Sequence, residues 1–363
     1  MKNYKKIFAF FLIMAVTLSM LAGCKKKAEE TPAETQAPQT QLKVETKAPE
    51  TEPETESDNI PEGMMRNFTN GEIVDKETGM KRPFTIMLNN ISEAVPQYGI
   101  RCADIIYEAE VEGGITRLLG VFSDASEAER VGSIRSARHS FLDFAHDVDG
   151  IYTHFGWSVV AQSLITNNDI PTLRPEVDSG NTIFYRAEDR AAPHDVFTTM
   201  DRLETGVEMN NYERNHAEGY TGNLNWYPVD TDLENGNNAS KISLPYNSGA
   251  YFEYDSANKV YKRYQYGGEQ IDGETGGQLT FKNVLALYAH QENYEGTILQ
   301  DLDLYTKGTG IYATNGKAVN ITWEKKDADD QTHFYNEDGS ELKLNVGKTF
   351  IAYVSTEKAV TVE

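Results

Sequence analysis

Positive charge and cysteine are both scarce in this sequence. Its 363 residues include 34 lysines and arginines against 56 aspartates and glutamates, which gives a formal net charge of −22 at pH 7. So acidic a chain argues against a nucleic-acid partner, because phosphate binding requires concentrated lysine and arginine. Only two cysteines are present, Cys24 and Cys102. The sequence also lacks a phosphate-binding glycine loop, a nucleophile elbow, a zinc-protease helix and any repeat with a solenoid period, so it does not match the enzyme classes and repeat folds that these signals mark.

Long apolar runs are equally rare, and the clearest one, Ile7–Leu21, follows three lysines at the start of the chain. It is short and ends at small residues, which predicts a secretory signal peptide over residues 1–23 and not a membrane span. Residues 21–24, LAGC, resemble the lipobox of bacterial lipoproteins. The resemblance implies that Cys24 is acylated and anchors the chain on the extracytoplasmic face of the cell membrane. The alternative is an ordinary signal peptide, which either directs secretion of the protein or stays uncleaved.

Residues 24–62 are rich in proline, threonine and glutamate and contain almost no apolar side chain. Such a segment cannot bury enough apolar surface to offset the entropy of ordering it, so we predict a disordered tether. Fully extended, it would reach on the order of 100 Å from the lipid. Cys102 lacks a second thiol in the folded part, and its position before an apolar run favours a buried, unreactive side chain over a nucleophile.

About 300 residues remain, which is too many for one small core and predicts two domains or one large composite. Strands mixed with amphipathic helices predict an N-terminal mixed α/β domain, a sheet–helix sandwich, over residues 63–220. From Asn225 onward tyrosine, asparagine and glycine increase, and short strands alternate with turn signals. Residues 221–363 are therefore predicted to form a β-rich domain, and the predicted fold class is α+β.

Three strands are predicted early in the first domain: Pro83–Asn90, Ala103–Glu112 and Leu118–Ser123. Alternation along the second strand places Glu108, Glu110 and Glu112 on one face. Three carboxylates on one face repel each other, so at least one is expected to be protonated, paired with arginine or directed into water. The alternative is an edge strand with a solvated acidic face.

Residues 130–156 combine arginine and histidine with apolar periodicity. The apolar spacing predicts a helix over Ala137–Val148, which Ser136 would cap, and a strand over Ile151–Phe155 follows it. On that helix His139, Asp143 and His146 share one face, which together with His154 would make a metal half-site.

In the rest of the first domain, the sequence predicts a helix over Ser158–Asn167 and a strand over Thr182–Arg186. Asp195 would either cap the helix after it or contribute to a site. His194 follows Pro193 in a predicted loop. The unperturbed pKa of histidine would allow it to act as an acid or base near neutral pH. The alternative is a structural histidine that hydrogen-bonds to the loop backbone.

Several separated motifs resemble the YerB-like lipoprotein family across essentially the whole folded part. They are Arg82–Asn90, Tyr107–Glu108, Glu112–Arg117, Ile134–Arg138, His154, Pro193–His194, Tyr254–Asp255, Tyr261–Arg263, Lys282–Val284, Gly308–Gly310, Asn315–Lys317 and Trp323. The resemblance implies a bacterial envelope lipoprotein with an α/β N-terminal and a β-rich C-terminal domain, and it brings no catalytic residue with it.

Residues that fall on the family's motifs are Glu108, Glu112, Arg117, Arg135, Arg138, Asp143, His154 and His194. Glu110, His139 and His146 depart from its pattern, so the metal half-site is not expected, and neither a metal nor a cofactor is predicted.

Two classes of function fit these residues. The first is an envelope protein that either binds or cleaves a cell-wall glycan such as peptidoglycan, with Glu108 or Glu112 as a general acid whose pKa is raised by burial or by carboxylate neighbours. The predicted ligand-binding residues are Arg117, Arg135, Ser136, Arg138, His154, Arg186 and His194, because guanidinium groups hold carboxylates by paired hydrogen bonds. The second class is a non-catalytic module in which the same ions are structural and a tyrosine-rich sheet docks an envelope protein. Cross-strand pairing is the alternative explanation for those tyrosines.

Overall fold

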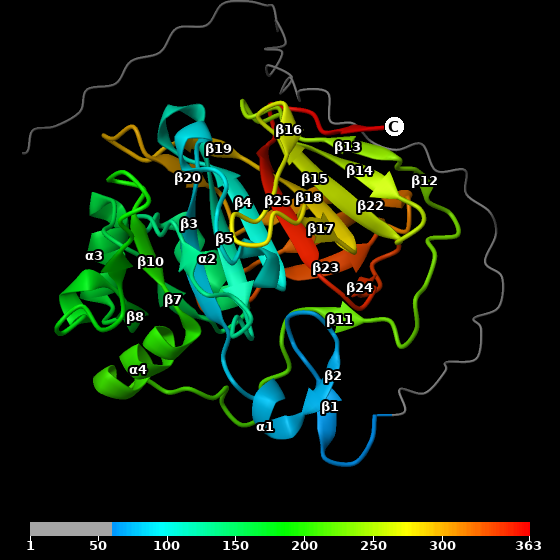
Figure 1. The fold of residues 1–363 in the computed structure, drawn as a ribbon. Coiled ribbons are helices and arrows are strands. Elements are labelled where there is room, and N and C mark those ends of the chain that lie inside the picture. Colours follow the sequence, from blue (N-terminus) through cyan, green and yellow to red (C-terminus); the bar gives the residue numbers. More distant parts are fainter. Residues whose placement is uncertain (1–59) are drawn as a thin grey trace, which may run out of the picture. The chain divides into compact units, whose positions relative to one another are not determined.

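A computed structural model describes residues 60–363, and its centre is a mixed sheet of eleven strands (Figure 1). The predicted signal peptide, Cys24 and nearly all of the predicted tether lie outside the described residues. In spatial order the strands are β12 (Asn237–Asn238), β22 (Lys317–Glu324), β21 (Lys307–Thr314), β18 (Asn283–Ala289), β25 (Thr349–Ser355), β4 (Ile105–Glu110), β5 (Thr116–Phe122), β3 (Phe84–Asn90), β7 (Ile151–Thr153) and β8 (Thr172–Leu173), with β23 (His333–Asn336) paired to β22.

Strands from both halves of the sequence share this sheet. β25, close to the C-terminus, pairs in parallel with β4 from Thr349 opposite Ile105 to Tyr353 opposite Ala109. The α+β fold class is confirmed. The domain limits at residues 63–220 and 221–363 stay predictions, and backbone hydrogen bonds cross between these two regions at the middle of the sheet.

Two layers cover opposite faces of the central sheet. One face packs against α2 (Ser140–Asp147) and α3 (Val159–Asn167) through an apolar cluster that includes Phe141, Phe144 and Ile165. The other face packs against α4 (Met200–Asn210) and a second sheet of six strands. That sheet runs β16 (Gly268–Glu269), β15 (Val260–Gln265), β14 (Tyr251–Asp255), β13 (Lys241–Ser243) and β26 (Thr361–Val362), with β17 (Thr280–Phe281) paired to β15.

The remaining elements are short. They are α1 (Lys76–Gly79), β1 (Met64–Arg66), β2 (Ile73–Asp75), β6 (Val131–Gly132), β9 (Tyr185–Arg186), β10 (Val196–Thr198), β11 (Asn225–Trp226), β19 (Gln291–Asn293), β20 (Gln300–Leu302) and β24 (Lys343–Leu344). Four 3₁₀ turns join them: η1 (Ser92–Ala94), η2 (Ile100–Cys102), η3 (Glu112–Gly114) and η4 (Pro175–Val177). Within residues 60–363 no helix has the length and apolarity to cross a membrane.

Two predicted helix caps are wrong. α2 begins at Ser140, so Ser136 lies in the preceding loop, and no side chain caps the helix. α4 is capped by Thr199, whose hydroxyl accepts from the backbone N–H of Arg202, while Asp195 lies before β10. Both aspartate and serine are favoured at caps generally. Asp195 is followed directly by the strand β10, and Ser136 lies four residues before the first residue of α2. α3 begins at Val159, one residue after the predicted start, and Ser158 caps it.

The tyrosines of the second sheet pair across neighbouring strands. Tyr251 lies opposite Tyr264, with ring centroids 4.7 Å apart and nearly parallel planes, and Tyr254 lies opposite Tyr261. These contacts are the usual stabilising pairs of an antiparallel sheet. They account for the tyrosine cluster without a ligand.

The three strand glutamates are separated by the fold. β4 lies inside the sheet between β25 and β5, so the prediction of a solvated edge strand is wrong. Glu108 and Glu110 lie within β4 and face the same side, whereas the chain turns into η3 at Glu112. Each carboxylate has its own cation: Arg263 for Glu108, Lys358 for Glu110 and Arg138 for Glu112.

The pair formed by Glu108 and Arg263 is fully buried between the two sheets. Glu108 Oε2 lies 2.5 Å from Arg263 Nη2, and both side chains are 0% exposed. Glu108 Oε1 accepts from the Thr116 hydroxyl at 2.6 Å and from Asn90 Nδ2 at 3.0 Å. The rings of Phe252 and Phe350 lie 4.7 and 4.5 Å from the guanidinium carbon of Arg263. This ion pair is therefore enclosed by aromatic rings and completed by neutral hydrogen-bond donors.

Replacing Glu108 with glutamine is expected to lower the free energy of unfolding by about 3–5 kcal/mol, because Arg263 would remain buried without a counter-ion. Denaturant unfolding followed by circular dichroism measures the loss. Lys262→Gln is the matched control on the same strand, since it breaks the surface pair between Lys262 and Asp255 and is expected to change stability little. Equal losses of unfolding free energy in the two variants would show that the buried pair contributes no more to stability than the surface pair does.

Candidate functional site

Three arginines gather around one carboxylate at the start of α2. Arg138 donates from Nε to Glu112 Oε2 at 2.8 Å and from Nη2 to Glu112 Oε1. Arg117, from the first part of β5, places Nη2 4.0 Å from the same carboxylate and donates from Nη1 to the backbone carbonyl of Ser136 at 2.5 Å. Ser136 thus contributes its carbonyl to the cluster. We call Arg117, Arg135, Arg138 and Glu112 the arginine cluster.

Charge repulsion within the cluster is visible in its pKa values. Burial, and then the charge of Arg138, lower the pKa of Arg117 to about 9, and the same two causes lower the pKa of Arg135. Burial alone would raise the pKa of Glu112, but the hydrogen bond and charge of Arg138, with help from Arg117, lower it to about 2. The cluster therefore holds three cations against one anion.

Two guanidinium nitrogens of the cluster are buried without a hydrogen-bond partner among the described residues. Arg117 is only 5% exposed, and its buried Nε has no hydrogen-bond partner among residues 60–363; the same holds for Nε of Arg135. A buried donor without a partner costs stability. An oxygen-rich anion beside the partly exposed Arg135 would offset the surplus charge.

His194 adjoins Arg135. Arg135 donates from Nη1 to the carbonyl of Pro193 at 3.0 Å, and His194 Nδ1 lies 2.7 Å from Asn89 Nδ2. Asn89 is the register partner of Arg117 across β3 and β5. Burial, then the charge of Arg135, lower the pKa of His194. A neutral imidazole at the margin of the cluster follows from this arrangement.

The structure sets His154 and Arg186 apart from the cluster. His154 is fully buried, with Nδ1 2.8 Å from the carbonyl of Gly156 and Nε2 3.2 Å from the Thr172 hydroxyl, and burial lowers its pKa to about 4. Its ring supports the backbone behind Ser136 and does not face a ligand. Arg186 pairs with Asp195 at 2.7 Å and extends into solvent.

Neither glutamate proposed as a general acid has the environment that the role needs. A general acid in this chemistry carries a raised pKa and contacts the substrate. Glu108 is enclosed between the two sheets, and Glu112 is held as a carboxylate by Arg138. Acid catalysis by these two groups is therefore not supported.

The residues of the metal half-site do not meet. His139 Nε2 lies 3.0 Å from Asp301 Oδ1, His146 is exposed, and His154 is bonded elsewhere. Over residues 60–363 no group of three or more histidine, cysteine, aspartate or glutamate side chains is arranged to hold a metal ion.

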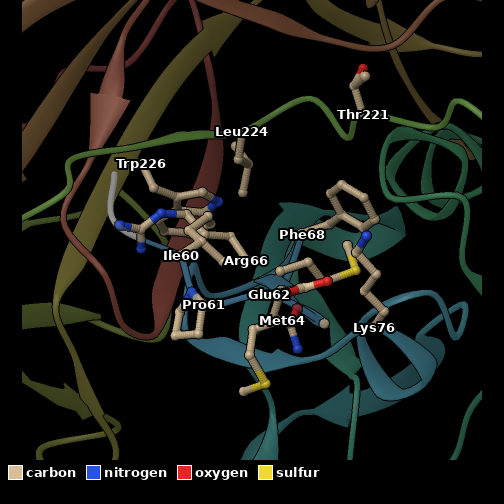
Figure 2. A pocket seen from close by; sticks show the side chains of 13 residues that line it. Ile60, Pro61, Glu62, Met64, Arg66, Phe68, Lys76, Thr221, Leu224 and Trp226 are labelled. Atoms are coloured by element: carbon tan, nitrogen blue, oxygen red, sulfur yellow. The ribbon is translucent and has the colours of Figure 1, made fainter. Parts of the chain in front are cut away.

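The structure also contains pockets that the sequence did not predict, and two of them have similar volumes. One, of about 520 Å³, is formed by Met64, Phe68, Leu224 and Trp226 with the first described residues, and Figure 2 shows these side chains around it. The other, of about 510 Å³, lies beside α2 and includes Asp143 and Tyr152. The methionines and tryptophan of the first hollow come from segments far apart in the chain, so no local pattern marks it.

Comparisons with known proteins agree with this architecture. Residues 68–213 match the family described as "Protein of unknown function (DUF3048) N-terminal domain", and residues 242–351 match the corresponding C-terminal domain. The "Putative lipoprotein YerB" of Bacillus subtilis (strain 168) is 27% identical over 287 residues, which cover 78% of this chain and 84% of that protein. The crystal structure of the YerB protein from Bacillus subtilis aligns with a TM-score of 0.73 at 26% identity, over 82% of this chain and 99% of that one.

The chain belongs to the YerB-like family. This confirms the resemblance seen in the sequence motifs. The region that matches the N-terminal family domain contains the whole arginine cluster, since Arg117, Arg135, Arg138 and Glu112 all fall within residues 68–213.

Glu112→Gln is expected to destabilise the fold by about 2–3 kcal/mol at pH 7, because a carboxylate whose pKa falls from 4.5 to about 2 on folding is lost. A lowered folded pKa gives stability that is present above pH 4.5 and disappears as the pH falls toward 2. The difference between the variant and the parent protein should therefore shrink across that interval. Thermal unfolding at pH 7, 5, 4 and 3 measures it. Glu218→Gln, which removes an exposed carboxylate, should show no such convergence.

Proposed function

We propose that this protein is a lipid-anchored envelope protein whose arginine cluster binds a carboxylate-bearing ligand such as peptidoglycan on the extracytoplasmic face of the cell membrane. The observation that carries the proposal is the surplus of two positive charges at the cluster. That surplus lies in a chain whose formal net charge is −22. Self-repulsion among guanidinium groups is unfavourable in the absence of an anion. A ligand carboxylate removes it.

The anchor rests on Cys24 and on similarity to a protein named as a lipoprotein. The sequence LAGC ending at Cys24 supports lipidation, and the relative from Bacillus subtilis carries the name "Putative lipoprotein YerB". A doubly acylated cysteine holds a protein firmly at a bilayer, since each buried CH₂ contributes about 0.8 kcal/mol. The folded part would then act close to the cell wall.

The environments of Glu108 and Glu112 support ligand binding and not hydrolysis of the ligand. Glu112 is committed to Arg138 by two hydrogen bonds, so it orients guanidinium groups and does not supply a proton. Arg135 lacks a carboxylate within ion-pair distance among the described residues and is partly exposed. It is the group best placed to contact a ligand first.

Cys24→Ala is expected to move the protein from the membrane fraction to the soluble fraction, because the acyl chains would be missing. Fractionation of bacterial cells followed by immunoblotting measures the distribution. Cys102→Ala is the control, since Cys102 is half-buried in the folded part and should leave the protein in the membrane fraction. Equal distributions for the two variants would refute the anchor.

Arg135→Gln is expected to weaken binding to purified peptidoglycan about tenfold, because one charge-assisted hydrogen bond is lost. Co-sedimentation of the full chain in detergent micelles with peptidoglycan measures the affinity. Peptidoglycan whose carboxyl groups have been amidated should bind the parent protein equally weakly. Arg202→Gln is the matched control, because Arg202 donates to the backbone carbonyls of Asn181 and Thr182 and, within residues 60–363, pairs with no carboxylate.

Two results would overturn the proposal. One is undiminished binding by Arg135→Gln or by the amidated polymer. The other is stable recovery of an envelope protein with no affinity for peptidoglycan, which would favour the interaction module instead. Release of soluble muropeptides, lost in Glu112→Gln with the fold intact, would restore the enzymatic interpretation.

A further inference from the structure

The hollow beside α2 has the size of a small-molecule site. Its volume of about 510 Å³ falls within the range of roughly 300–1,000 Å³ typical of ligand pockets. The walls come from α2, from the segment between α3 and β8, and from Tyr305 and Asp329 in the second half of the chain. None of the three clustered arginines lines it. Leu142, Leu164 and Ile170 give it an apolar wall.

Two residues that line this pocket carry buried polar groups whose hydrogen bonding is incomplete within residues 60–363. Tyr152 is 2% exposed, and its hydroxyl proton has no acceptor among residues 60–363. His139 is 6% exposed, and its Nδ1 also has no partner there. Because His139 Nε2 lies 3.0 Å from Asp301 Oδ1, the ring proton belongs on Nε2, which leaves Nδ1 as an acceptor. The pocket therefore has one spare donor and one spare acceptor.

The pocket also has a surplus of negative charge at Asp143. The ammonium of Lys325 lies 2.8 Å from Asp147 but 3.9 Å from Asp143, so one cation serves two carboxylates. The Tyr305 hydroxyl donates to Asp143 at 3.0 Å without adding charge. Burial above all raises the pKa of Asp143 to about 6, against the opposing effect of Lys325.

Asp149, a partly exposed acid of the wall, is already neutralised. Asp149 Oδ1 lies 3.2 Å from Arg82 Nε, and its Oδ2 lies 2.8 Å from His216 Nδ1. A ligand cation would therefore be drawn to Asp143 and not to Asp149. Enclosing a carboxylate without a full counter-ion is unfavourable, and such groups concentrate at binding sites.

We propose that this pocket binds a small hydroxylated amine, with its ammonium group at Asp143, its hydroxyl groups on Tyr152 and His139, and its carbon skeleton against Leu142 and Ile170. The ammonium supplies the second cation that Asp143 and Asp147 lack. A hydroxyl group both donates and accepts, so it satisfies the tyrosine proton and the imidazole lone pair. Tyr305, half-exposed at the rim, offers a ring face to the same ligand. No arginine of the cluster lines this pocket, and the cluster has the opposite charge, although Arg117 and Arg138 lie near enough to Tyr152 to act on its hydroxyl.

Glucosamine is the test probe, and glucose is its neutral counterpart of nearly the same shape. Isothermal titration of the full chain in detergent micelles at pH 7 is expected to show saturable binding of glucosamine, about tenfold tighter than that of glucose, because only glucosamine makes a charge-assisted bond. Asp143→Asn should reduce glucosamine affinity about tenfold and leave glucose affinity nearly unchanged.

Two further variants keep the test decisive. Tyr152→Phe removes a hydroxyl without a protein acceptor, so the fold should be retained, and both sugars should bind a few-fold more weakly. Asp303→Asn removes the same charge as Asp143→Asn from an exposed neighbour outside the pocket, and it should bind glucosamine as the parent chain does. Circular dichroism checks the fold of each variant, and Tyr152→Phe decides the matter if Asp143→Asn fails to fold.

Three outcomes would overturn the proposal. The first is the absence of saturable glucosamine binding by the parent chain. The second is equal affinity for glucosamine and glucose. The third is a loss of affinity in Asp303→Asn as large as that in Asp143→Asn, which would mean that net charge attracts the amine and the pocket does not hold it.

Discussion

The buried ion pair between Glu108 and Arg263 is the contact on which the rest of the structure depends. It joins residues 155 positions apart in sequence and connects the middle of the central sheet to the second sheet. Removing two charges from water is costly, so the pair is stable only with this geometry and with the neutral donors around it. A slip of either sheet by one residue would turn the partner away and leave a bare charge in the interior. The pair therefore fixes the register between the two sheets.

That register also forms the arginine cluster. Asn90 and Thr116 donate to Glu108 on one face of the central sheet. Because side chains alternate along a strand, their chain neighbours Asn89 and Arg117 must face the opposite side. There Asn89 contacts His194, and Arg117 contacts the carbonyl of Ser136. The buried ion pair and Arg117 of the arginine cluster therefore lie on opposite faces of the same paired strands, whereas Arg135 and Arg138 come from the loop before α2.

Local sequence patterns predicted the strands around Phe84–Asn90 and Ile105–Glu110 and the helix after Ser158 to within about two residues, because periodicity and capping are local properties. They could not predict which strands pair. The parallel contact between β4 and β25 joins segments from opposite ends of the folded part, so local patterns left open whether the acidic strand lies at an edge, and the structure has it inside the sheet. Arg263, the partner of Glu108, was named only within a family motif for the same reason. Within the site, Arg135 and Arg138 were recognised from their density, whereas the separation of His154 depends on Gly156 and Thr172, which carry no signal in the sequence.

Helix α2 brings the two proposed sites close together in sequence while their charges have opposite sign. A helix carries a partial positive charge at its N-terminus and a partial negative charge at its C-terminus, and a well-placed opposite charge gains about 0.3–1 kcal/mol. Arg135 and Arg138 precede the N-terminus, where the dipole adds to their charge, whereas Asp143 lies in the first turn, where the dipole favours a carboxylate. Asp147, the last residue, is opposed by the dipole, and Lys325 lies closer to it, at 2.8 Å, than to Asp143, at 3.9 Å. Glu112 therefore offsets one arginine and Lys325 offsets one of the two aspartates. An anion at the arginine cluster and an amine at Asp143 would each compensate for a charge that these side chains leave in excess.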